Sequence, residues 1–277
     1  MTSDVLLVGC GDLGSAIGLR LAALGHDVLA LRRRAELVPD ALRGLSVDLT
    51  QETPVLTDLR ADLLVVALTA RPRTEAAYRE TYVLGLGRAL DALAATGHLP
   101  RRAVLVSSTA VHGSTDDPVL ENETVAPEPA DGPAQMLLEA EELFTERLPA
   151  ATVLRLSGLY GGSGRGTRLV DTVREGRVGD PHRWTNRIHR EDAAAAVVHL
   201  LTRPGEPQRV YLGTDDEPAQ LGEVAAYLAD RLGAPSPPRA DPARGHGKRL
   251  SNARLRATGW APTRPSYREG YADVGRP

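Results

Sequence analysis

Apolar and polar residues alternate in blocks that predict strands and helices in turn. An apolar run at 5–8 predicts the first strand. The next apolar residues recur at helical spacing: Leu13, Ile17, Leu21 and Leu24. Gly25 ends this helix, and a second apolar run at 28–31 predicts the second strand.

The same pattern continues along the chain. Further strands are expected at 45–47, 62–68, 102–107, 152–156 and 209–212. Further helices are expected at 35–42, 75–95, 134–147, 169–175, 192–201 and 221–232. The run 62–68 is apolar along its length, which is typical of a parallel strand buried on both faces. Polar, proline-rich stretches at 113–133 and 234–247 predict loops.

This order of elements predicts an α/β fold: a Rossmann-type doubly wound parallel sheet with a smaller C-terminal lobe. We expect residues 1–158 to form a dinucleotide-binding domain and 159–277 a substrate-binding lobe. About 186–213 would return to the sheet.

Three glycines stand between the first strand and the first helix in the order G-x-G-x-x-G. Gly9 permits a tight turn, Gly11 lets a pyrophosphate approach the backbone, and Gly14 lets the helix pack closely on the strand. The N–H groups and positive dipole end of the helix would then face the phosphates. With a strand before it and an amphipathic helix after it, the motif indicates a dinucleotide site, although a purely structural turn is the alternative.

The end of the second strand discriminates between the two nicotinamide dinucleotides. An NAD site usually places Asp or Glu there, against the ribose 2′-hydroxyl. Here Arg32 and Arg33 occupy that end, and Asp27 lies at the opposite end of the strand. Because arginine can hold a 2′-phosphate through paired hydrogen bonds, we expect NADP, with NAD as the alternative. The arginines would otherwise form a solvated basic turn.

Composition narrows the class of protein. The chain has 277 residues, a formal charge of −3 and 42% hydrophobic residues, which suits a globular α/β protein. Nothing in it favours a nucleic-acid or membrane partner, and we expect a cytoplasmic protein with a small-molecule substrate. The single cysteine, Cys10, excludes an intrachain disulfide and a cysteine-based zinc site. A homodimer through the helices at 75–95 and 134–147 stays open.

Several strings, in order, resemble the extended short-chain dehydrogenase/reductases, and in particular the NAD(P)-dependent epimerase/dehydratase-like proteins. They are VGCGDLG at 8–14, VDLT at 47–50, VLVSSTAVHG at 104–113, LRLSGLYG at 154–161, NRIHREDAAAAVVHLL at 186–201 and RLSNARLRATGW at 249–260. The resemblance covers nearly the whole chain.

The resemblance implies roles for particular positions. Gly9, Gly11, Asp12, Leu13 and Gly14 would surround the pyrophosphate. Asp48 and Leu49 would lie beside the adenine, and Ala67 and Leu68 along a ribose. Ser108 falls at the family's catalytic Ser or Thr. Residues 156–159 would approach the nicotinamide, Arg165 would belong to a loop that often carries arginine, and His189 would lie near the substrate lobe.

One departure from the family is chemical. The family carries Tyr-x-x-x-Lys at the start of the helix after the long loop, where this chain has Pro133 and Leu137. The only lysine is Lys248, more than a hundred positions downstream. In the family, lysine lowers the tyrosine pKa so that the phenol exchanges a proton during hydride transfer. That proton relay is missing here.

Other side chains are candidates to replace it. Tyr82, where relatives often have Asn, is four residues from Tyr78 on one helix face. His112 and His189 are possible proton carriers, and the hydroxyl of Ser108 can bond a substrate carbonyl. Each has a structural alternative: core packing for the tyrosines and loop orientation for the histidines. Asp192 is expected to cap its own helix.

Three functions therefore compete. The first is an NADP-dependent oxidoreductase that acts on a small carbonyl, alcohol or imine with a non-standard proton donor. The second is a non-redox isomerase, dehydratase or cyclase on the same scaffold. The third is a non-catalytic NADP-binding sensor.

Overall fold

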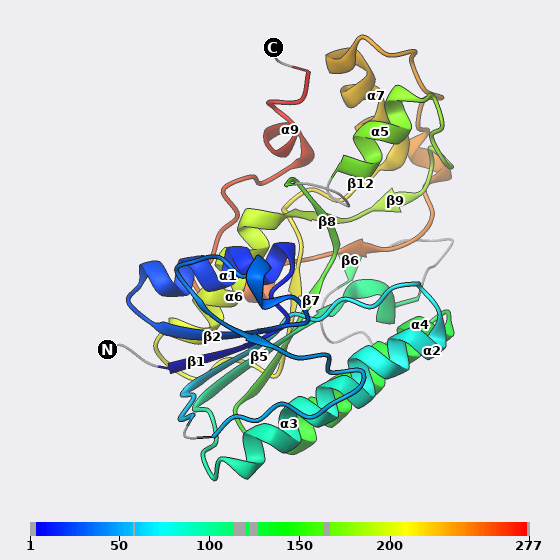
Figure 1. Cartoon of the computed structure of the whole chain (residues 1–277). Helices are drawn as coiled ribbons and strands as arrows, with labels where there is room; N and C mark the ends of the chain where they lie inside the picture. Colours follow the sequence, from blue (N-terminus) through cyan, green and yellow to red (C-terminus); the bar gives the residue numbers. More distant parts are fainter. Residues whose placement is uncertain (1–3, 58, 114–119, 122–126, 163–166, 276–277) are drawn as a thin grey trace. The chain divides into compact units, whose positions relative to one another are not determined.

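The computed structural model describes residues 4–57, 59–113, 120–121, 127–162 and 167–275; the side chains of 120–121 are not described. Its centre is a seven-stranded sheet in the order β11-β7-β5-β4-β1-β2-β3 (Figure 1). Its strands are β1 Asp4–Val8, β2 Asp27–Arg32, β3 Arg43–Ser46, β4 Leu63–Val66, β5 Arg102–Ser108, β7 Ala151–Leu156 and β11 Val210–Gly213. This confirms the predicted α/β class.

The sheet is parallel. Val5 pairs with Val28 of β2 and with Leu63 of β4, so β1 lies between them. The chain runs outward from β1 to β3, then returns to β4 on the other side of β1 and continues to β11. This reversal beside β1 is the switch point at which open α/β sheets bind ligands, outside the carboxyl ends of the strands.

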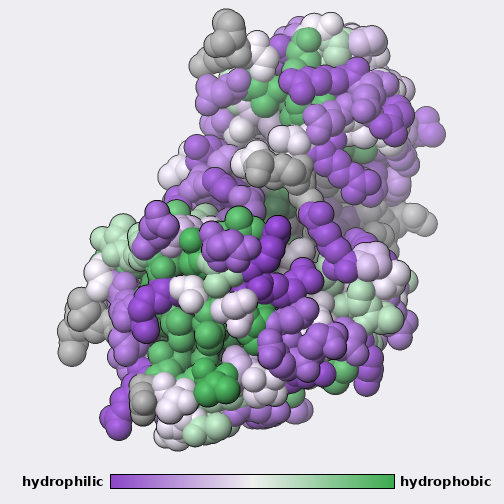
Figure 2. All heavy atoms as spheres, in the orientation of Figure 1, coloured by the Kyte–Doolittle hydropathy of each residue, from purple (hydrophilic) through white to green (hydrophobic). Residues whose placement is uncertain are grey.

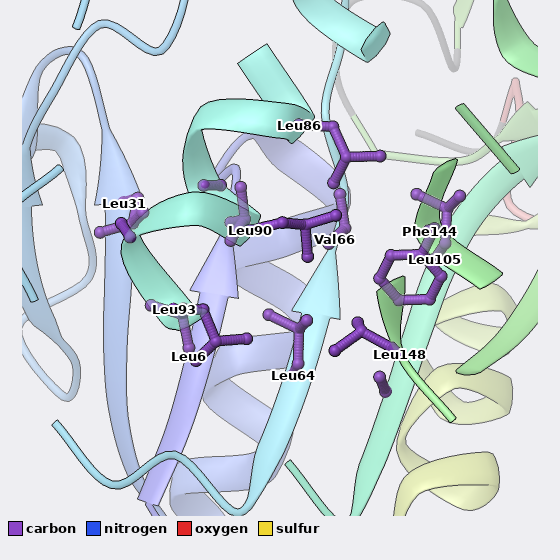
Figure 3. Packing of buried hydrophobic residues seen from close by; sticks show 14 of the residues in the cluster. Leu6, Leu31, Leu64, Val66, Leu86, Leu90, Leu93, Leu105, Phe144 and Leu148 are labelled. Atoms are coloured by element: carbon purple, nitrogen blue, oxygen red, sulfur yellow. The ribbon is translucent and has the colours of Figure 1, made fainter. Parts of the chain in front are cut away.

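Helices cover both faces of the sheet. Their bounds are α1 Asp12–Ala23, α2 Glu75–Tyr78, α3 Leu86–Ala95, α4 Gly132–Arg147 and α6 Arg190–Thr202. One face packs on α3 and α4 through a core that includes Leu6, Leu64, Leu90, Leu105 and Phe144 (Figure 3). The opposite face carries α1 and α6 (Figure 1). This double burial explains why β4, in the middle of the sheet, is apolar along its whole length.

Contacts divide the chain into two compact units. Unit 1 contains 1–111, 128–155 and 194–211, and unit 2 contains 112–127, 156–193 and 212–277. The expected boundary at 158 lies close to the end of a unit 1 segment at Arg155. Two assignments differ from expectation: residues 112–127 belong to unit 2, and the segment that returns to unit 1 is 194–211.

Unit 2 is built from short elements. Its strands are β6 Leu120–Glu121, β8 Gly158–Tyr160, β9 Trp184–Thr185, β10 Arg187–His189, β12 Ala219–Gln220 and β13 Arg249–Leu250. They form three two-stranded pairs: β10 with β8, β12 with β9 and β13 with β6. Its helices are α5 Arg168–Arg174, α7 Leu221–Leu232, α8 Ala253–Arg256 and α9 Tyr267–Gly270. Gly233 ends α7 in a left-handed conformation, as its position predicts.

Two helix predictions were wrong in detail. The helix expected at 35–42 is only a 3-10 turn at Ala35–Leu37, because Pro39 cannot continue a helix and restricts the residue before it. The helix expected at 75–95 contains a π-helical segment, Arg79–Gly85, between α2 and α3. Such segments are frequent at functional sites.

The described part of the chain has no helix long and apolar enough to cross a bilayer. Its exposed large apolar side chains come from separate segments: Leu19, Leu24, Leu37, Val55, Leu84, Leu99 and Leu159. Figure 2 shows one face, on which hydrophilic residues predominate and a group of hydrophobic residues lies in the lower half.

Candidate functional site

The glycine turn after β1 is built as its sequence predicts. Gly9 has φ +96°, a conformation that side chains with a Cβ rarely adopt, and a Cβ there would lie 2.6 Å from the carbonyl oxygen of Ala67. A Cβ on Gly14 would lie 2.1 Å from the carbonyl oxygen of Gly9. These two glycines therefore let the turn, the end of β4 and α1 approach one another.

Gly11 differs from both. A Cβ at Gly11 would meet nothing within 4 Å, and its φ of −82° suits any residue, so the fold itself does not require glycine here. Gly11 is also the N-cap of α1, and no side chain caps this helix. The amides of the first turn, beginning with Asp12 and Leu13, are therefore placed to bind an anion in the space beside Gly11. The pyrophosphate predicted from the glycine motif would lie in this space.

The predicted cofactor residues after β4 lie against this turn. Ala67 donates its N–H to the carbonyl oxygen of Val8 at 2.8 Å. The carbonyl oxygen of Leu68 accepts a hydrogen bond from the Tyr82 hydroxyl at 3.2 Å. Because β4 neighbours β1, the structure brings Ala67 and Leu68 to the edge of the sheet that carries the glycine turn.

The predicted nucleotide-selecting residues follow β2 and β3. Arg32 donates through Nη1 to the carbonyl oxygen of Leu37 at 2.7 Å, which ties its side chain to the 3-10 turn. Arg33 is exposed. Of the two arginines, Arg33 is the more exposed, and its charge acts on the Asp48 carboxylate after β3.

Asp48 and Leu49 follow β3. The Asp48 carboxylate accepts hydrogen bonds from the Thr50 side chain and backbone, which hold its pKa below the usual value; Arg33 also lowers it. The carbonyl oxygen of Leu49 accepts a hydrogen bond from Arg88 at 2.8 Å. These contacts fix the turn expected to lie beside the adenine.

Ser108 ends β5 and is half-buried. Its Oγ accepts a hydrogen bond from the Ala110 N–H at 3.2 Å, which supports the 3-10 turn that follows. Ser108 thus lies at the same carboxyl edge of the sheet as the glycine turn, separated from it in the sheet by β4.

The start of α4 is the position at which the resemblance led us to expect a tyrosine and a lysine. Asp131 caps the helix by accepting a hydrogen bond from Ala134, and Pro133 lies in its first turn. Leu137, which the resemblance puts at the lysine position, is buried in a cluster with other apolar side chains: Ala70, Tyr78, Val111 and Met136. The structure thus shows apolar packing at the position where the resemblance led us to expect an ammonium group.

Tyr82 lies in the π-helical segment and packs at a tilt against Tyr78, with 5.1 Å between ring centroids. Since its hydroxyl donates to Leu68, Tyr82 links this segment to the predicted cofactor edge.

Unit 2 contains the two histidine candidates. His189 is buried, and its ring lies edge-on to Tyr160 at 5.3 Å. Its Nδ1 accepts a hydrogen bond from the Glu191 N–H, so the neutral tautomer carries its proton on Nε2. Burial lowers the pKa of His189 below 6.5, which favours neutral imidazole at pH 7.

His112 is also buried, and its carbonyl oxygen accepts a 2.6 Å hydrogen bond from the Nζ of Lys248. The only lysine of the chain therefore binds the segment that follows Ser108, in place of the helix where the family carries its lysine. His112 and His189 belong to unit 2, whereas Ser108 and Tyr82 belong to unit 1.

Asp192 does not cap its own helix, contrary to expectation. Its carboxylate accepts hydrogen bonds from Thr263 and Arg264, so it anchors a C-terminal segment of unit 2 instead. The reason is burial: the carboxylate is 1% exposed and finds its donors in a distant segment of the chain. The predicted Arg165 lies outside the described residues.

Sequence reasoning missed a buried ionisable cluster in unit 2. Asp215 follows β11 and is 1% exposed, and its burial raises its pKa to about 8, although Arg187 lowers it. The Tyr160 hydroxyl donates to the carbonyl oxygen of Ser266, and burial raises its pKa. The two acids Asp215 and Asp216 beside a predicted strand end gave no signal that one of them is buried. The described residues contain no cluster of metal-ligating side chains.

Fold and site together define an NAD(P)-binding protein of the Rossmann type. A model of the NAD dependent epimerase/dehydratase family matches residues 5–213, and the chain belongs to this family. The family supports a nicotinamide cofactor and places the chain among the short-chain oxidoreductases and epimerases in the broad sense.

Individual relatives agree with this assignment. The chain is 32% identical to a Streptomyces protein named 3-diazoavenalumate denitrifying reductase, with 96% of this chain and 98% of that protein covered. It is 35% identical to the structure of a putative NAD-dependent epimerase/dehydratase from Methylobacillus flagellatus, with a TM-score of 0.85 and 98% and 97% coverage. UDP-glucose 4-epimerase from Thermus thermophilus, solved with NAD, matches at 21% identity and a TM-score of 0.76 over 99% and 98%, which shows the shared fold.

Proposed function

We propose that the protein is an NADP-dependent reductase that delivers hydride to a small organic acceptor whose reduction needs no proton from a tuned tyrosine. The observation that carries the proposal is a contrast within unit 1. The glycine turn keeps open space at Gly11 before the first amides of α1, whereas Leu137 is packed among apolar side chains at the position where the resemblance led us to expect lysine.

The cofactor end follows from the residues described above. The first-turn amides of α1 bind the pyrophosphate in the space beside Gly11, and the Ala67–Leu68 segment lines a ribose. Arg33, exposed beside this edge, pairs with the 2′-phosphate, which favours NADP over NAD. When bound in its reduced form, the nicotinamide supplies a hydride.

The acceptor class follows from the missing acid. A carbonyl that accepts hydride becomes an alkoxide and requires a proton. An arenediazonium ion that accepts hydride at its ring carbon forms a C–H bond as the C–N bond breaks, and the C–N electron pair leaves with N₂. The products are a neutral arene and N₂, so no proton donor is needed.

Three observations support this acceptor class for the chain. Tyr82 already donates its hydroxyl to Leu68, and His189 is neutral at pH 7, so neither is prepared as an acid. Ser108 has a half-buried hydroxyl at the strand end and serves to orient the acceptor. The fully covered relative carries the name of a denitrifying reductase that acts on a diazo compound.

The test compares two acceptors with the same ring. The purified protein is incubated with NADPH deuterated at nicotinamide C4 and with either para-carboxybenzenediazonium or para-carboxybenzaldehyde. We expect protein-dependent NADPH oxidation, N₂ release and deuterium on the former C–N carbon with the diazonium, and slow or no turnover with the aldehyde. Gly11→Val is the matched control, because direct reduction of the diazonium by free NADPH continues in that variant.

Other outcomes separate the competing functions. Faster reduction of the aldehyde than of the diazonium would retain a reductase but overturn the acceptor class, and one of the candidate side chains would then supply the proton. Conversion of a substrate without net NADPH oxidation would support an isomerase, dehydratase or cyclase. Tight NADPH binding without turnover of any acceptor would support a sensor.

A further inference from the structure

Three buried polar side chains meet in unit 1 between two strands and a helix. Ser107 comes from β5, Glu141 from α4 and Arg155 from β7, and each is less than a tenth exposed. Arg155 donates to the Glu141 carboxylate through Nε at 3.1 Å and through Nη2 at 2.7 Å. The Ser107 hydroxyl donates to the same carboxylate at 2.5 Å. We call these three side chains the buried triad.

The triad lies next in the chain to the residues of the proposed chemistry. Ser107 immediately precedes Ser108, and Arg155 immediately precedes Leu156, the first residue of the segment expected to approach the nicotinamide. The two strands are neighbours in the sheet. Because successive side chains on a strand point to opposite faces, holding Ser107 from the α4 side fixes the backbone that presents Ser108.

Stability alone is a poor reason for such a buried charge pair. Removing two charges from water is costly, and apolar side chains of similar size often give equal or greater stability at such positions. Apolar side chains would suit the surroundings of the triad, since Ala140, Phe144 and Val153, which are close to it in the chain, are fully buried in the apolar core. The directional hydrogen bonds of the triad instead specify how the two strand ends are placed on α4.

We propose that the buried triad is a positioning device that sets the ends of β5 and β7 for the nicotinamide half of the cofactor and for the acceptor. Glu141 acts through its neighbours and touches neither ligand. In this protein α4 has lost the tyrosine and lysine that act directly, and it retains a role through Glu141, one helical turn beyond Leu137. This inference rests on the proposed function.

The test replaces the charge pair by apolar side chains of similar size in Glu141→Leu/Arg155→Met. Thermal unfolding is measured, together with the affinities for NADPH and for 2′-phospho-ADP-ribose, which lacks the nicotinamide. We expect the unfolding temperature to stay close to that of the wild type and fragment binding to change less than about twofold. We expect the advantage of NADPH over the fragment to fall by about tenfold or more, because only NADPH carries the nicotinamide that the displaced strand ends would contact.

Two further variants sharpen the result. Asp91→Leu/Arg147→Met removes an exposed pair, 2.7 Å long, that also joins α4 to a neighbouring helix, and it should leave the NADPH advantage unchanged. Ser107→Ala keeps the charge pair and removes only the β5 contact, so it should fold and lose part of the advantage. If the double variant does not fold, the NADPH advantage of Ser107→Ala alone tests the positioning role of the buried triad.

An unchanged NADPH advantage in the stable double variant would overturn the inference, as would an unchanged advantage in Ser107→Ala when the double variant does not fold. A wild type that binds NADPH no more tightly than the fragment would overturn it as well. The measurement uses no acceptor. Failure of the wild type to reduce any acceptor therefore counts against the proposed function and not against the triad.

Discussion

The glycine turn after β1 and the start of α4 lie in the same unit but differ in what they offer a ligand: the turn has open space at Gly11, and the start of α4 is filled by apolar side chains. In the turn, Gly9 and Gly14 have structural reasons, positive φ at Gly9 and close packing at Gly14, whereas Gly11 leaves open space that the fold itself does not need. At α4, Leu137 packs among apolar side chains, at the position where the resemblance led us to expect a lysine.

The difference teaches that cofactor binding and proton transfer are separable in this fold. The turn depends on backbone amides and on the absence of side chains, so it is insensitive to what α4 carries. Under the proposed function, the apolar start of α4 would remove one proton-transfer step and leave hydride supply intact. The proposed acceptor, which needs hydride and no proton, would be consistent with both regions. The following predictions test first the glycine turn and then the start of α4.

The largest effect is expected at the turn. Gly11→Val should abolish measurable NADPH binding, a loss of at least about a hundredfold, or roughly 3 kcal/mol. The valine would occupy the pyrophosphate space, yet it meets no protein atom within 4 Å of its Cβ position. Cofactor titration by nicotinamide fluorescence, with circular dichroism to verify folding, measures both properties.

Gly14→Val is the informative comparison, because its Cβ would collide with the carbonyl oxygen of Gly9. It should lower the unfolding temperature, which Gly11→Val should not. A folded Gly11→Val protein that binds NADPH as the wild type does would place the ligand elsewhere.

The next effect concerns the start of α4. Leu137→Lys should lower the free energy of unfolding on the order of 4 kcal/mol at pH 7, because an apolar site shifts a buried lysine pKa by about three units or more. Leu137→Met should be nearly neutral, since it conserves volume. Chemical denaturation of both variants measures the difference. A stable Leu137→Lys protein would mean that the position still accepts the family's lysine.

A smaller effect than that of Leu137→Lys is expected for the arginines that would select the nucleotide. Arg33→Ala should weaken NADPH binding by about tenfold to a hundredfold, or 1.5–3 kcal/mol, and leave NADH binding unchanged, because only NADPH carries the 2′-phosphate. Arg32→Ala should do less, since Arg32 is held by Leu37. Arg34→Ala is the control. Equal binding of NADH and NADPH to the wild type would refute the assignment of NADP.

Much of the fold followed from sequence because local pattern and tertiary burial agree there. The strands β1, β2, β4 and β5 are mostly apolar and bounded by turn residues, and the glycine motif fixes its own geometry. The short strand pairs of unit 2 carry no such periodicity, since two or three residues cannot display one. They form through contacts distant in sequence, such as β8 with β10.

The contacts of the candidate site were harder to predict from sequence, because they too join residues that are distant in the chain. Asp192 bonds residues more than seventy positions away, which local capping rules cannot anticipate. The buried triad did leave a signal: Glu141 shares a face of the predicted helix with Leu137 and Phe144, and Arg155 lies between two leucines of a strand. Opposite charges at two buried positions predict a pair, but only the fold identifies the partner.

A smaller effect is expected at Tyr82. Tyr82→Phe removes the hydrogen bond to Leu68 and should lower kcat/KM by less than about tenfold, the scale of one neutral hydrogen bond. A general acid would account for about 10²–10⁴-fold. Steady-state kinetics with whichever of the two test acceptors is reduced gives the value of kcat/KM, and Tyr78→Phe is the matched control. A loss beyond about a hundredfold, specific to Tyr82, would restore it as the proton donor.

The smallest expected effect is the dependence of catalysis on His189 and pH. Burial holds the pKa of His189 below its unfolded value of 6.5, so between about pH 6.5 and 8 the imidazole stays neutral and kcat/KM should be flat. Because the folded state disfavours the cation, stability should decline as pH falls below 6.5 toward the lowered pKa. His189→Gln should remove that decline and leave the kinetic profile unchanged. If His189 were the acid, kcat/KM would rise as pH falls through its pKa, and His189→Gln would abolish the rise. The unfolding temperature and kcat/KM of both proteins, measured from pH 8 to below pH 6.5, therefore distinguish a buried structural histidine from a proton donor.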